Sequence, residues 1–238
     1  MIKLSDRLML MAAQIKQNET MADIGTDHGF LPLYLLETKK CPKVIMADIS
    51  SGSLAKAEEN CKMAKPDGDY ELRLGDGIDI LEDGEVDVVA IAGMGGNLIA
   101  DILEWNLEKS RSIKRYILQP RRHVGRLRHW LYCNGFEIVK ESLVEEGKFI
   151  CEILTVESRP AGNSKTAEYG VEFDYPDSLL QHVNPMTAAY LERKLKLENM
   201  ILDNINQNSQ NASGEGELCK ARIARLEDLI SKLEEQHA

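Results

Sequence analysis

The first 158 residues alternate between short apolar runs and longer segments with helical spacing of their apolar residues. The runs predict strands at 20–25, 43–50, 70–77, 86–96 and 114–120, and the segments between them predict helices. Such alternation is typical of an α/β fold, a mostly parallel sheet with helices on both faces. Residues 136–158 predict two strands joined directly around Glu145–Gly147, so we expect one of them to run antiparallel near an edge.

The chain changes character after residue 158. We expect a main domain over 1–158, a linker over 159–185 and a helical hairpin over 186–238. Leucine, isoleucine and cysteine recur there at helical spacings, at Leu191, Leu195, Leu202 and Ile205 and again at Cys219, Ile223, Leu226, Ile230 and Leu233. The polar segment 207–216 separates the two runs, which predicts a short antiparallel coiled coil. The alternative is that both helices pack back onto the main domain.

Composition narrows the classes of protein. The net charge of −10 is unlike that of most nucleic-acid-binding proteins, yet 111–136 carries seven Lys/Arg and no acid, which suits local docking of a polyanion. The five cysteines form no C-x-x-C pair, so we expect no metal site. The chain has no apolar run of membrane-spanning length and no secretory signal at its start, so we expect a cytoplasmic protein without a membrane partner.

The most informative motif is DIGTDHG at 23–29, which follows the first expected strand. Gly25 and Gly29 let the backbone approach a ligand closely. A dinucleotide-binding loop has the order G-x-G-x-x-G, whereas here Asp27 stands where a phosphate site needs glycine. An acid at that point repels phosphate and suits a positively charged ligand. S-adenosylmethionine fits, because it carries a sulfonium and an ammonium group and no phosphate.

Three successive strands are expected to end in acids. Asp23 can organise the loop or bind the ammonium group through water, Asp48 is placed for the ribose hydroxyls, and Asp76 can accept from the adenine amine. Ordered in this way, with a glycine loop at the first, the acids predict a nucleoside site. The alternative is that they cap helices or brace loops.

Two further strand ends predict the place of the substrate. AGMGG at 92–96 can shape the floor where a target base meets the methyl group, or form a simple tight turn. In LQPRRH at 118–123, Gln119 can bind a base edge, and Arg121 and Arg122 a phosphate. The alternative for each arginine is a solvated helix face.

Taken together, LSDRL, ADIGTDHGFLP, ADIS, GDG, IAGMGG, LQPR and GKFICEI resemble the bacterial tRNA (adenine-N1)-methyltransferase family acting on adenine 22, the TrmK family. The resemblance covers the whole chain. It implies a class I, Rossmann-like methyltransferase fold with a coiled-coil hairpin behind it, S-adenosyl-L-methionine as cofactor and tRNA as partner. It also implies methyl transfer to N1 of the adenine.

The resemblance also implies roles for individual residues. The expected cofactor residues are Asp23, Gly25, Asp27, His28, Asp48, Ile49, Asp76, Gly77, Gly93 and Met94. The candidates for catalysis are Asn97, Asp6 and Gln119, in a target pocket to which Ser5, Arg7, Met94 and Arg121 also contribute. The expected nucleic-acid contacts are Arg7, Arg115, Arg121, Arg122, Arg126 and Arg128. We expect a monomer, or a weak dimer through the hairpin.

Three alternatives remain at this point. One is a nicotinamide-dependent oxidoreductase, against which Asp27 and the missing third glycine argue. A second is a non-catalytic tRNA-binding or scaffold protein that uses the coiled coil. A third is a methyltransferase for another RNA or for a small molecule.

Overall fold

The computed structural model describes residues 2–159, 164–181, 183–207 and 213–237. Its strands are β1 (Met21–Ile24), β2 (Lys43–Asp48), β3 (Asp69–Leu74), β4 (Val88–Met94), β5 (Arg115–Pro120), β6 (Phe136–Glu146) and β7 (Phe149–Ser158). Its helices are α1 (Asp6–Gln14), α2 (Phe30–Glu37), α3 (Ser51–Ala64), α4 (Gly96–Trp105), α5 (Leu107–Ser112), α6 (Val124–Cys133), α7 (Val171–Asp174), the 3₁₀ turn η1 (Asp177–Leu180), α8 (Met186–Gln207) and α9 (Ser213–His237).

The strands form one sheet in the order β3-β2-β1-β4-β5-β7-β6. The first five strands are parallel, and β7 pairs antiparallel with both β5 and β6. The expected antiparallel pair at one edge is therefore confirmed. Between β6 and β7, Gly147 (φ +63°) occupies the first of the two turn residues. Glycine suits this place in a two-residue hairpin because of its positive φ.

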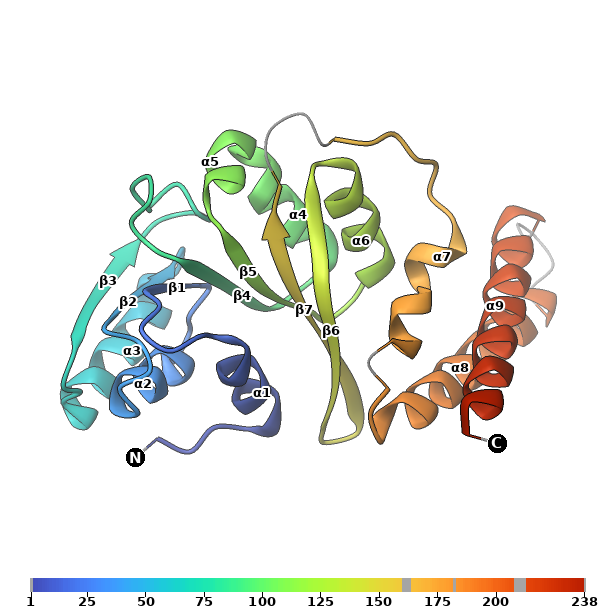
Figure 1. Cartoon of the computed structure of the whole chain (residues 1–238), viewed down its shortest axis with the longest axis horizontal. Coiled ribbons are helices and arrows are strands. Elements are labelled where there is room, and N and C mark those ends of the chain that lie inside the picture. The colour runs from blue at the N-terminus through green and yellow to red at the C-terminus, as the bar shows by residue number, and fades with distance from the viewer. Residues whose placement is uncertain (1, 160–163, 182, 208–212, 238) are drawn as a thin grey trace.

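Side chains of the central strands alternate between two cores, one on each face of the sheet. In β1, for example, Met21 packs with α1, α2 and α3, whereas Ala22 and Ile24 face α4 and α6. Figure 1 shows these two groups of helices on opposite sides of the sheet. Both faces are covered, which explains why β1, β2, β4 and β5 are nearly all apolar in sequence.

The two C-terminal helices lie side by side and form the expected hairpin (Figure 1). The hairpin does not stand free of the main domain. Leu191 and Leu226 share a buried cluster with Leu143 of β6 and with Tyr175 and Leu179 of the α7–η1 region. Both sequence interpretations thus hold in part, because the helices pair with each other and also pack at their base against β6. Part of the expected connection, 208–212, and part of the expected linker, 160–163 and 182, lie outside the described residues.

The main differences from the sequence-based elements are at their ends. The third strand stops at Leu74 rather than at Gly77, and the fourth covers Val88–Met94. Three short elements, α5, α7 and η1, were not expected. Among the described residues, none of the helices combines the length and the apolar character that crossing a membrane requires.

Candidate functional site

A cavity of about 740 Å³ opens at the carboxyl ends of β1, β2, β3 and β4. Strand order reverses here, because β2 and β4 flank β1 on opposite sides. Ligands of open α/β sheets bind at such a switch point. All ten residues expected to contact the cofactor line this cavity: Asp23, Gly25, Asp27, His28, Asp48, Ile49, Asp76, Gly77, Gly93 and Met94.

The loop after β1 is held tightly against its neighbours. The backbone N–H groups of Gly25 and Thr26 both donate to the carbonyl oxygen of Ala47, at 2.8 and 3.0 Å. Gly25 has φ +76°, and a Cβ built on it would lie 2.2 Å from Cε of Met94. Only glycine fits there, since a side chain would be strained and would displace Met94 from the cavity wall.

Asp23 lies at the base of the cavity and is almost fully buried. Its carboxylate accepts a 2.8 Å hydrogen bond from the Thr26 hydroxyl. Burial raises the pKa of Asp23 to about 6, while the Thr26 hydrogen bond and the charge of Arg7 work in the opposite direction. At neutral pH the group is mainly ionised but poorly compensated, which favours a cationic neighbour.

Asp48, at the end of β2, contacts the backbone of Asp27 in the loop after β1. Asp48 accepts from the backbone N–H of Ser50 at 2.8 Å and from that of Asp27 at 3.3 Å. The Asp27 carboxylate pairs with Lys56 at 3.0 Å and lies 3.5 Å from Nε2 of His28. Lys56 therefore balances part of the negative charge of Asp27, which was expected to face the ligand.

Apolar side chains form the outer wall of the cavity. Ile49 is 73% exposed and Leu98 is 51% exposed, although both line the cavity. Phe30 and Ile102 extend this surface. Sequence reasoning missed Leu98, Phe30 and Ile102. For Leu98 a signal was present, because it lies in the first turn of the helix that follows GMGG.

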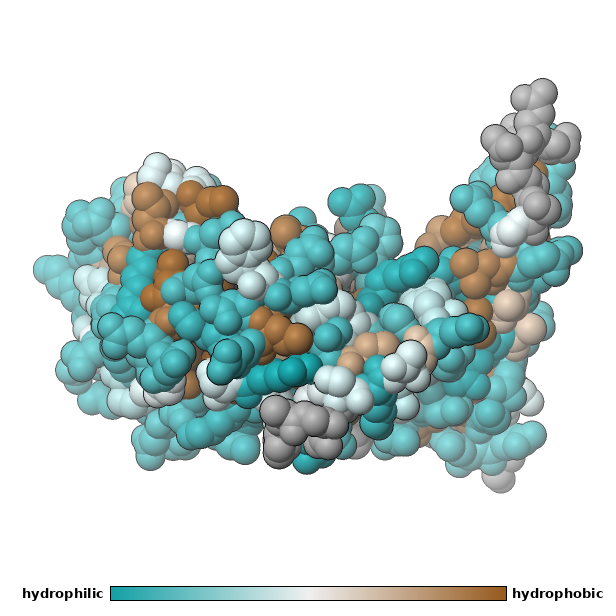
Figure 2. All heavy atoms as spheres, turned by 90° about the horizontal axis from the view of Figure 1, so that it is seen from above, coloured by the Kyte–Doolittle hydropathy of each residue, from teal (hydrophilic) through white to brown (hydrophobic). Residues whose placement is uncertain are grey.

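A second, larger cavity of about 1360 Å³ lies between the main domain and the helical hairpin; we call it the cleft. Figure 2 shows the molecule hollowed between its main body and the projecting hairpin. Eight Lys/Arg and four acids line the cleft, so it is basic in an otherwise acidic protein. Arg7 and Arg121 line both cavities, which places the cleft directly beside the first one.

Gln119 braces the boundary between the two cavities. Its side chain is buried, and its Oε1 accepts from the Gly93 N–H at 3.2 Å and from Nη1 of Arg7 at 3.1 Å. Its Nε2 donates to the carbonyl oxygen of Pro120. The amide expected to bind a base edge is thus occupied by the protein, and its direct effect is to hold Arg7 in place.

The other two catalytic candidates differ in position. Asn97 is exposed in the first turn of α4 and lines the cleft, one residue before Leu98 of the first cavity. Asp6 is exposed in the first turn of α1 and lines neither cavity. Asn97 therefore stays a candidate for catalysis, whereas Asp6 lies outside both cavities.

The expected basic surface is only partly present. Arg121, Arg122 and Arg126 are exposed and line the cleft, and Arg126 lies over the Tyr169 ring at 4.2 Å. Arg7 also lines it but is tied to Glu146 at 2.5 Å.

Arg115 and Arg128 are not available to a nucleic acid, so their expected role is wrong. Arg115 is 6% exposed at the start of β5, away from the cleft, and pairs with Glu19. Arg128 is 3% exposed and is held by Glu152 at 2.6 Å and by Glu141 at 2.9 Å. Burial of a charge is tolerated only with such partners, and the partners here are supplied by the protein.

Comparisons with known proteins agree with this geometry. A family model described as a methyltransferase domain matches residues 4–154. The Bacillus subtilis tRNA (adenine(22)-N(1))-methyltransferase is 36% identical over 170 residues, which cover 71% of this chain and 70% of that protein.

Two solved structures are similar over nearly the whole chain. A Streptococcus pneumoniae protein in complex with S-adenosyl-L-methionine has a TM-score of 0.82 at 29% identity, covering 96% of this chain and 100% of that one. M. capricolum TrmK in complex with S-adenosyl-homocysteine has a TM-score of 0.77 at 26% identity, covering 96% of this chain and 98% of that one. The chain has the class I methyltransferase fold and belongs to the tRNA (adenine(22)-N(1))-methyltransferase family.

Proposed function

We propose that this chain transfers a methyl group from S-adenosyl-L-methionine to N1 of adenine 22 in tRNA. The observation that carries the proposal is the pair of adjoining cavities. One is lined by acids and apolar side chains, the other is basic, and Arg7 and Arg121 border both. A small cationic nucleoside fits the first cavity and a polyanion fits the second. A base held in the cleft can therefore meet the methyl group at the boundary.

The residues of the first cavity fit this cofactor. Among the cavity acids in the described part of the chain, Asp27 pairs with Lys56, whereas Asp23, Asp48 and Asp76 have no ion-pair partner, which leaves these three carboxylates for a ligand. When bound, the cofactor supplies an electrophilic methyl group on a positively charged sulfur. Asp23 balances the positive charge, Asp48 accepts from the ribose hydroxyls and Asp76 accepts from the adenine amine. Ile49 and Leu98 cover the apolar ring and exclude water.

The chemical step requires positioning rather than a strong base. The N1 lone pair of adenine forms the new N–CH₃ bond as the bond between the methyl group and sulfur breaks. The positive charge passes from sulfur to the base, and no proton is transferred. The rigid boundary formed by Gln119, Arg7 and Gly93 holds the approach path, and positioning of this kind contributes a large part of catalysis.

The cleft is proposed to grip the tRNA backbone. Arg121, Arg122 and Arg126 are its exposed arginines from β5 and α6, and Arg193 and Lys194 face them from α8. Phosphate contacts of this kind release counterions, so affinity should fall steeply with salt. N1 of a paired or stacked adenine is inaccessible, so the base must be turned out to reach the boundary. We further propose that the enzyme acts as a monomer in the cytoplasm.

The proposal is tested with radiolabelled S-adenosyl-L-methionine and unmodified tRNA. We expect label in 1-methyladenosine at position 22 and none in a transcript with guanosine at that position, with digestion and nucleoside mapping as the measurement. Transfer to another nucleoside, or binding of tRNA without transfer, would contradict it. A thermal-shift comparison should show stabilisation by the methyl donor and none by NAD.

A further inference from the structure

Glu146 is an acid of the cleft that has no role in the mechanism proposed above. It is the last residue of β6, beside the turn that joins β6 to β7, and it lines the cleft. Its Oε2 lies 2.5 Å from Nε of Arg7, and Arg7 borders both cavities. Only one guanidinium group therefore separates this carboxylate from the wall of the first cavity.

The other acids of the cleft are committed to the fold. Glu152 pairs with buried Arg128 at 2.6 Å, and Asp174 pairs with Arg222 at 2.8 Å. Glu198 accepts from the Tyr175 hydroxyl at 3.1 Å inside the base of the hairpin. The side chains of Glu152 and Asp174 are 6% and 14% exposed and Glu198 is buried, whereas the side chain of Glu146 is 34% exposed. Glu146 is thus the most exposed of the four acids that line the cleft.

Glu146 is also fixed in orientation and charge. Arg7 holds it from one side, and Arg7 is held in turn by buried Gln119. Partial burial acts to raise the pKa of Glu146, but hydrogen bonds from Ser5 and Arg7 outweigh it and the pKa is lowered. The group is an anion at neutral pH. A carboxylate offers about four acceptor positions, so these partners leave it able to accept from a ligand.

Methylation of adenine N1 creates a positive charge that spreads over N1, C6 and the exocyclic nitrogen N6. The two N6–H bonds become stronger donors as the transition state is reached. An oriented anion that accepts one of them stabilises the transition state more than the neutral ground state. A site at the cleft boundary that holds adenine N1 toward the first cavity brings N6, on the adjacent carbon, near the same boundary.

We propose that Glu146 accepts a hydrogen bond from the N6 amine of the target adenine and stabilises the charge that develops on the base. This inference rests on the proposed function. It makes Glu146 a catalytic residue for adenine and gives the site a preference for a purine with a 6-amino group. A guanine offers a carbonyl at C6, which this anion repels.

The experiment compares wild type with Glu146→Gln under single-turnover conditions on two tRNAs. One carries adenosine at position 22 and the other carries purine riboside, which has hydrogen in place of the amine. On adenosine we expect the variant to be slower by about 100-fold, comparable to loss of one transition-state hydrogen-bond partner. On purine riboside we expect the two enzymes to differ by less than about threefold, because no N6–H is present to lose.

The opposing explanation is that Glu146 only positions Arg7. It predicts the same loss on both tRNAs, and that result, or no loss on adenosine, would overturn the proposal. Methyl transfer by the wild type on adenosine is the baseline, so failure of the proposed function is recognised separately. Thermal melting and cofactor affinity establish that Glu146→Gln is folded and loaded.

Glu145→Gln is the matched control. Glu145 is adjacent in sequence and also pairs with an arginine, Arg193, at 2.9 Å, but it does not line the cleft. We expect its single-turnover rate to stay within about twofold of wild type on both tRNAs, since it is an exposed surface pair. A loss equal to that of Glu146→Gln would mean that any charge change at this turn disturbs the enzyme, and would count against the proposal.

Discussion

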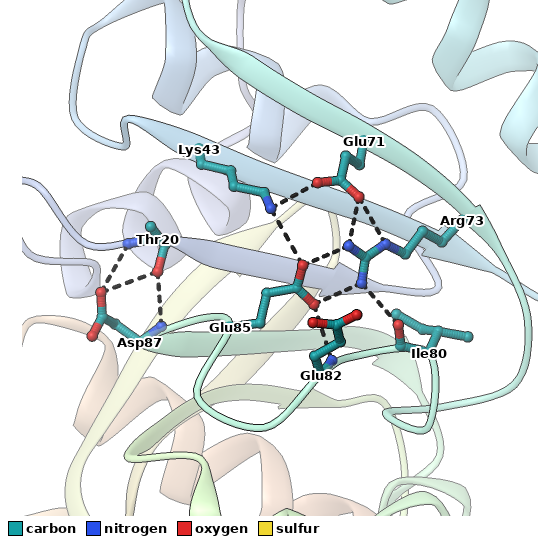
Figure 3. Close-up of polar contacts among 8 residues, drawn as sticks. All are labelled: Thr20, Lys43, Glu71, Arg73, Ile80, Glu82, Glu85 and Asp87. Carbon is teal, nitrogen blue, oxygen red and sulfur yellow. Dashed lines mark hydrogen bonds and ion pairs between the residues drawn. The ribbon is translucent and has the colours of Figure 1, made fainter.

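Two groups of acids in this protein have the same chemistry and opposite surroundings. Along β3 and at the starts of β2 and β4, acids are matched by bases. Glu71 and Glu85 share Lys43 and Arg73, as Figure 3 shows. The Arg73–Glu85 pair is 2.5 Å long. Asp87 accepts from the N–H and hydroxyl of Thr20, both at 3.1 Å, and pairs with Lys114.

At the carboxyl ends of the strands Asp27 pairs with Lys56, but three other acids lack such partners. Asp23 is buried beside Thr26, and Asp48 accepts only from backbone N–H groups among the described residues. Asp76 lines the cavity without an ion pair in that part of the chain. Acids in this sheet therefore stabilise the fold where bases accompany them, and remain available to a ligand where bases are missing.

The largest effect is expected at Asp48. Replacing Asp48→Asn should weaken binding of the methyl donor by about 100-fold, because two hydrogen bonds to a charged acceptor are together worth about 3 kcal/mol. The amide keeps one acceptor for the Ser50 N–H, so the fold should persist. Isothermal titration calorimetry measures the affinity. Affinity within a factor of three of wild type would place Asp48 with the structural acids.

Glu85→Gln should lower the stability of the fold and leave binding of the methyl donor unchanged, which is the reverse of the effect expected for Asp48→Asn. It removes an anion that is 13% exposed between Arg73 and Lys43, and we expect the free energy of unfolding to fall by about 2 kcal/mol. Hydrogen bonding to Arg73 lowers the pKa of Glu85 to about 2. Its stabilisation is therefore present above about pH 4.5 and lost as pH falls toward 2.

Urea unfolding at pH 7 and pH 3 measures the Glu85 effect, and the difference between wild type and variant should shrink at pH 3. Cofactor affinity at pH 7 should be unchanged. If Glu85→Gln bound the methyl donor poorly and kept its full stability, Glu85 would belong with the ligand-binding acids, which contradicts its assignment to the fold.

Asp23 predicts a smaller, pH-dependent effect. Its pKa of about 6 lies above the ordinary value of 3.8, so its ionisation makes the unliganded fold less stable as pH rises from about 4 to 6. A cationic ligand prefers the ionised form. Affinity for the methyl donor should therefore rise by about tenfold between pH 5 and pH 7. Calorimetry at both pH values checks this, with Asp23→Asn as a pH-insensitive control. If the affinity of the wild type and that of the variant changed equally between pH 5 and pH 7, Asp23 would not contact the ligand.

The smallest effect extends the comparison to the bases. Arg122→Ala should weaken tRNA binding several-fold and reduce the slope of log affinity against log salt by about 0.7 to 0.9. Lys114→Ala removes another exposed charge, which pairs with Asp87 at the amino ends of β4 and β5. It should leave that slope unchanged. Filter binding at several salt concentrations measures both, and equal effects would mean that the cleft is not the docking surface.

Much of this arrangement could be predicted from the sequence. The order of strands and helices follows from local periodicity, and the cofactor cavity follows from acids and glycines that directly succeed strands. These signals are short-range, because a residue at the end of a parallel strand reaches the same edge whatever lies elsewhere. For that reason Asp23, Asp48 and Asp76 fell into one cavity as expected.

The arginines could not be sorted in the same way. Arg115 is neutralised by Glu19, which is 96 positions away, and Arg128 by Glu141 and Glu152 on the two antiparallel strands. Nothing in the local pattern of the basic run separates these two from Arg122 and Arg126. Gln119 is similar, because its engagement with Arg7 depends on where α1 packs. Which of these side chains are occupied by the protein depends on partners distant in sequence, and the periodicity of the sequence does not reveal such partners.

The bond between Arg7 and Glu146 joins groups 139 residues apart in the chain. Arg7 precedes β1 and Glu146 ends β6, so the ribosome releases Arg7 well before Glu146. The carboxylate that pairs with Arg7 is supplied only by the β6–β7 hairpin, which is the last part of the sheet in sequence. The part of the chain that is released first therefore contains every residue that lines the cofactor cavity, and it lacks the carboxylate that holds Arg7 at the boundary with the cleft.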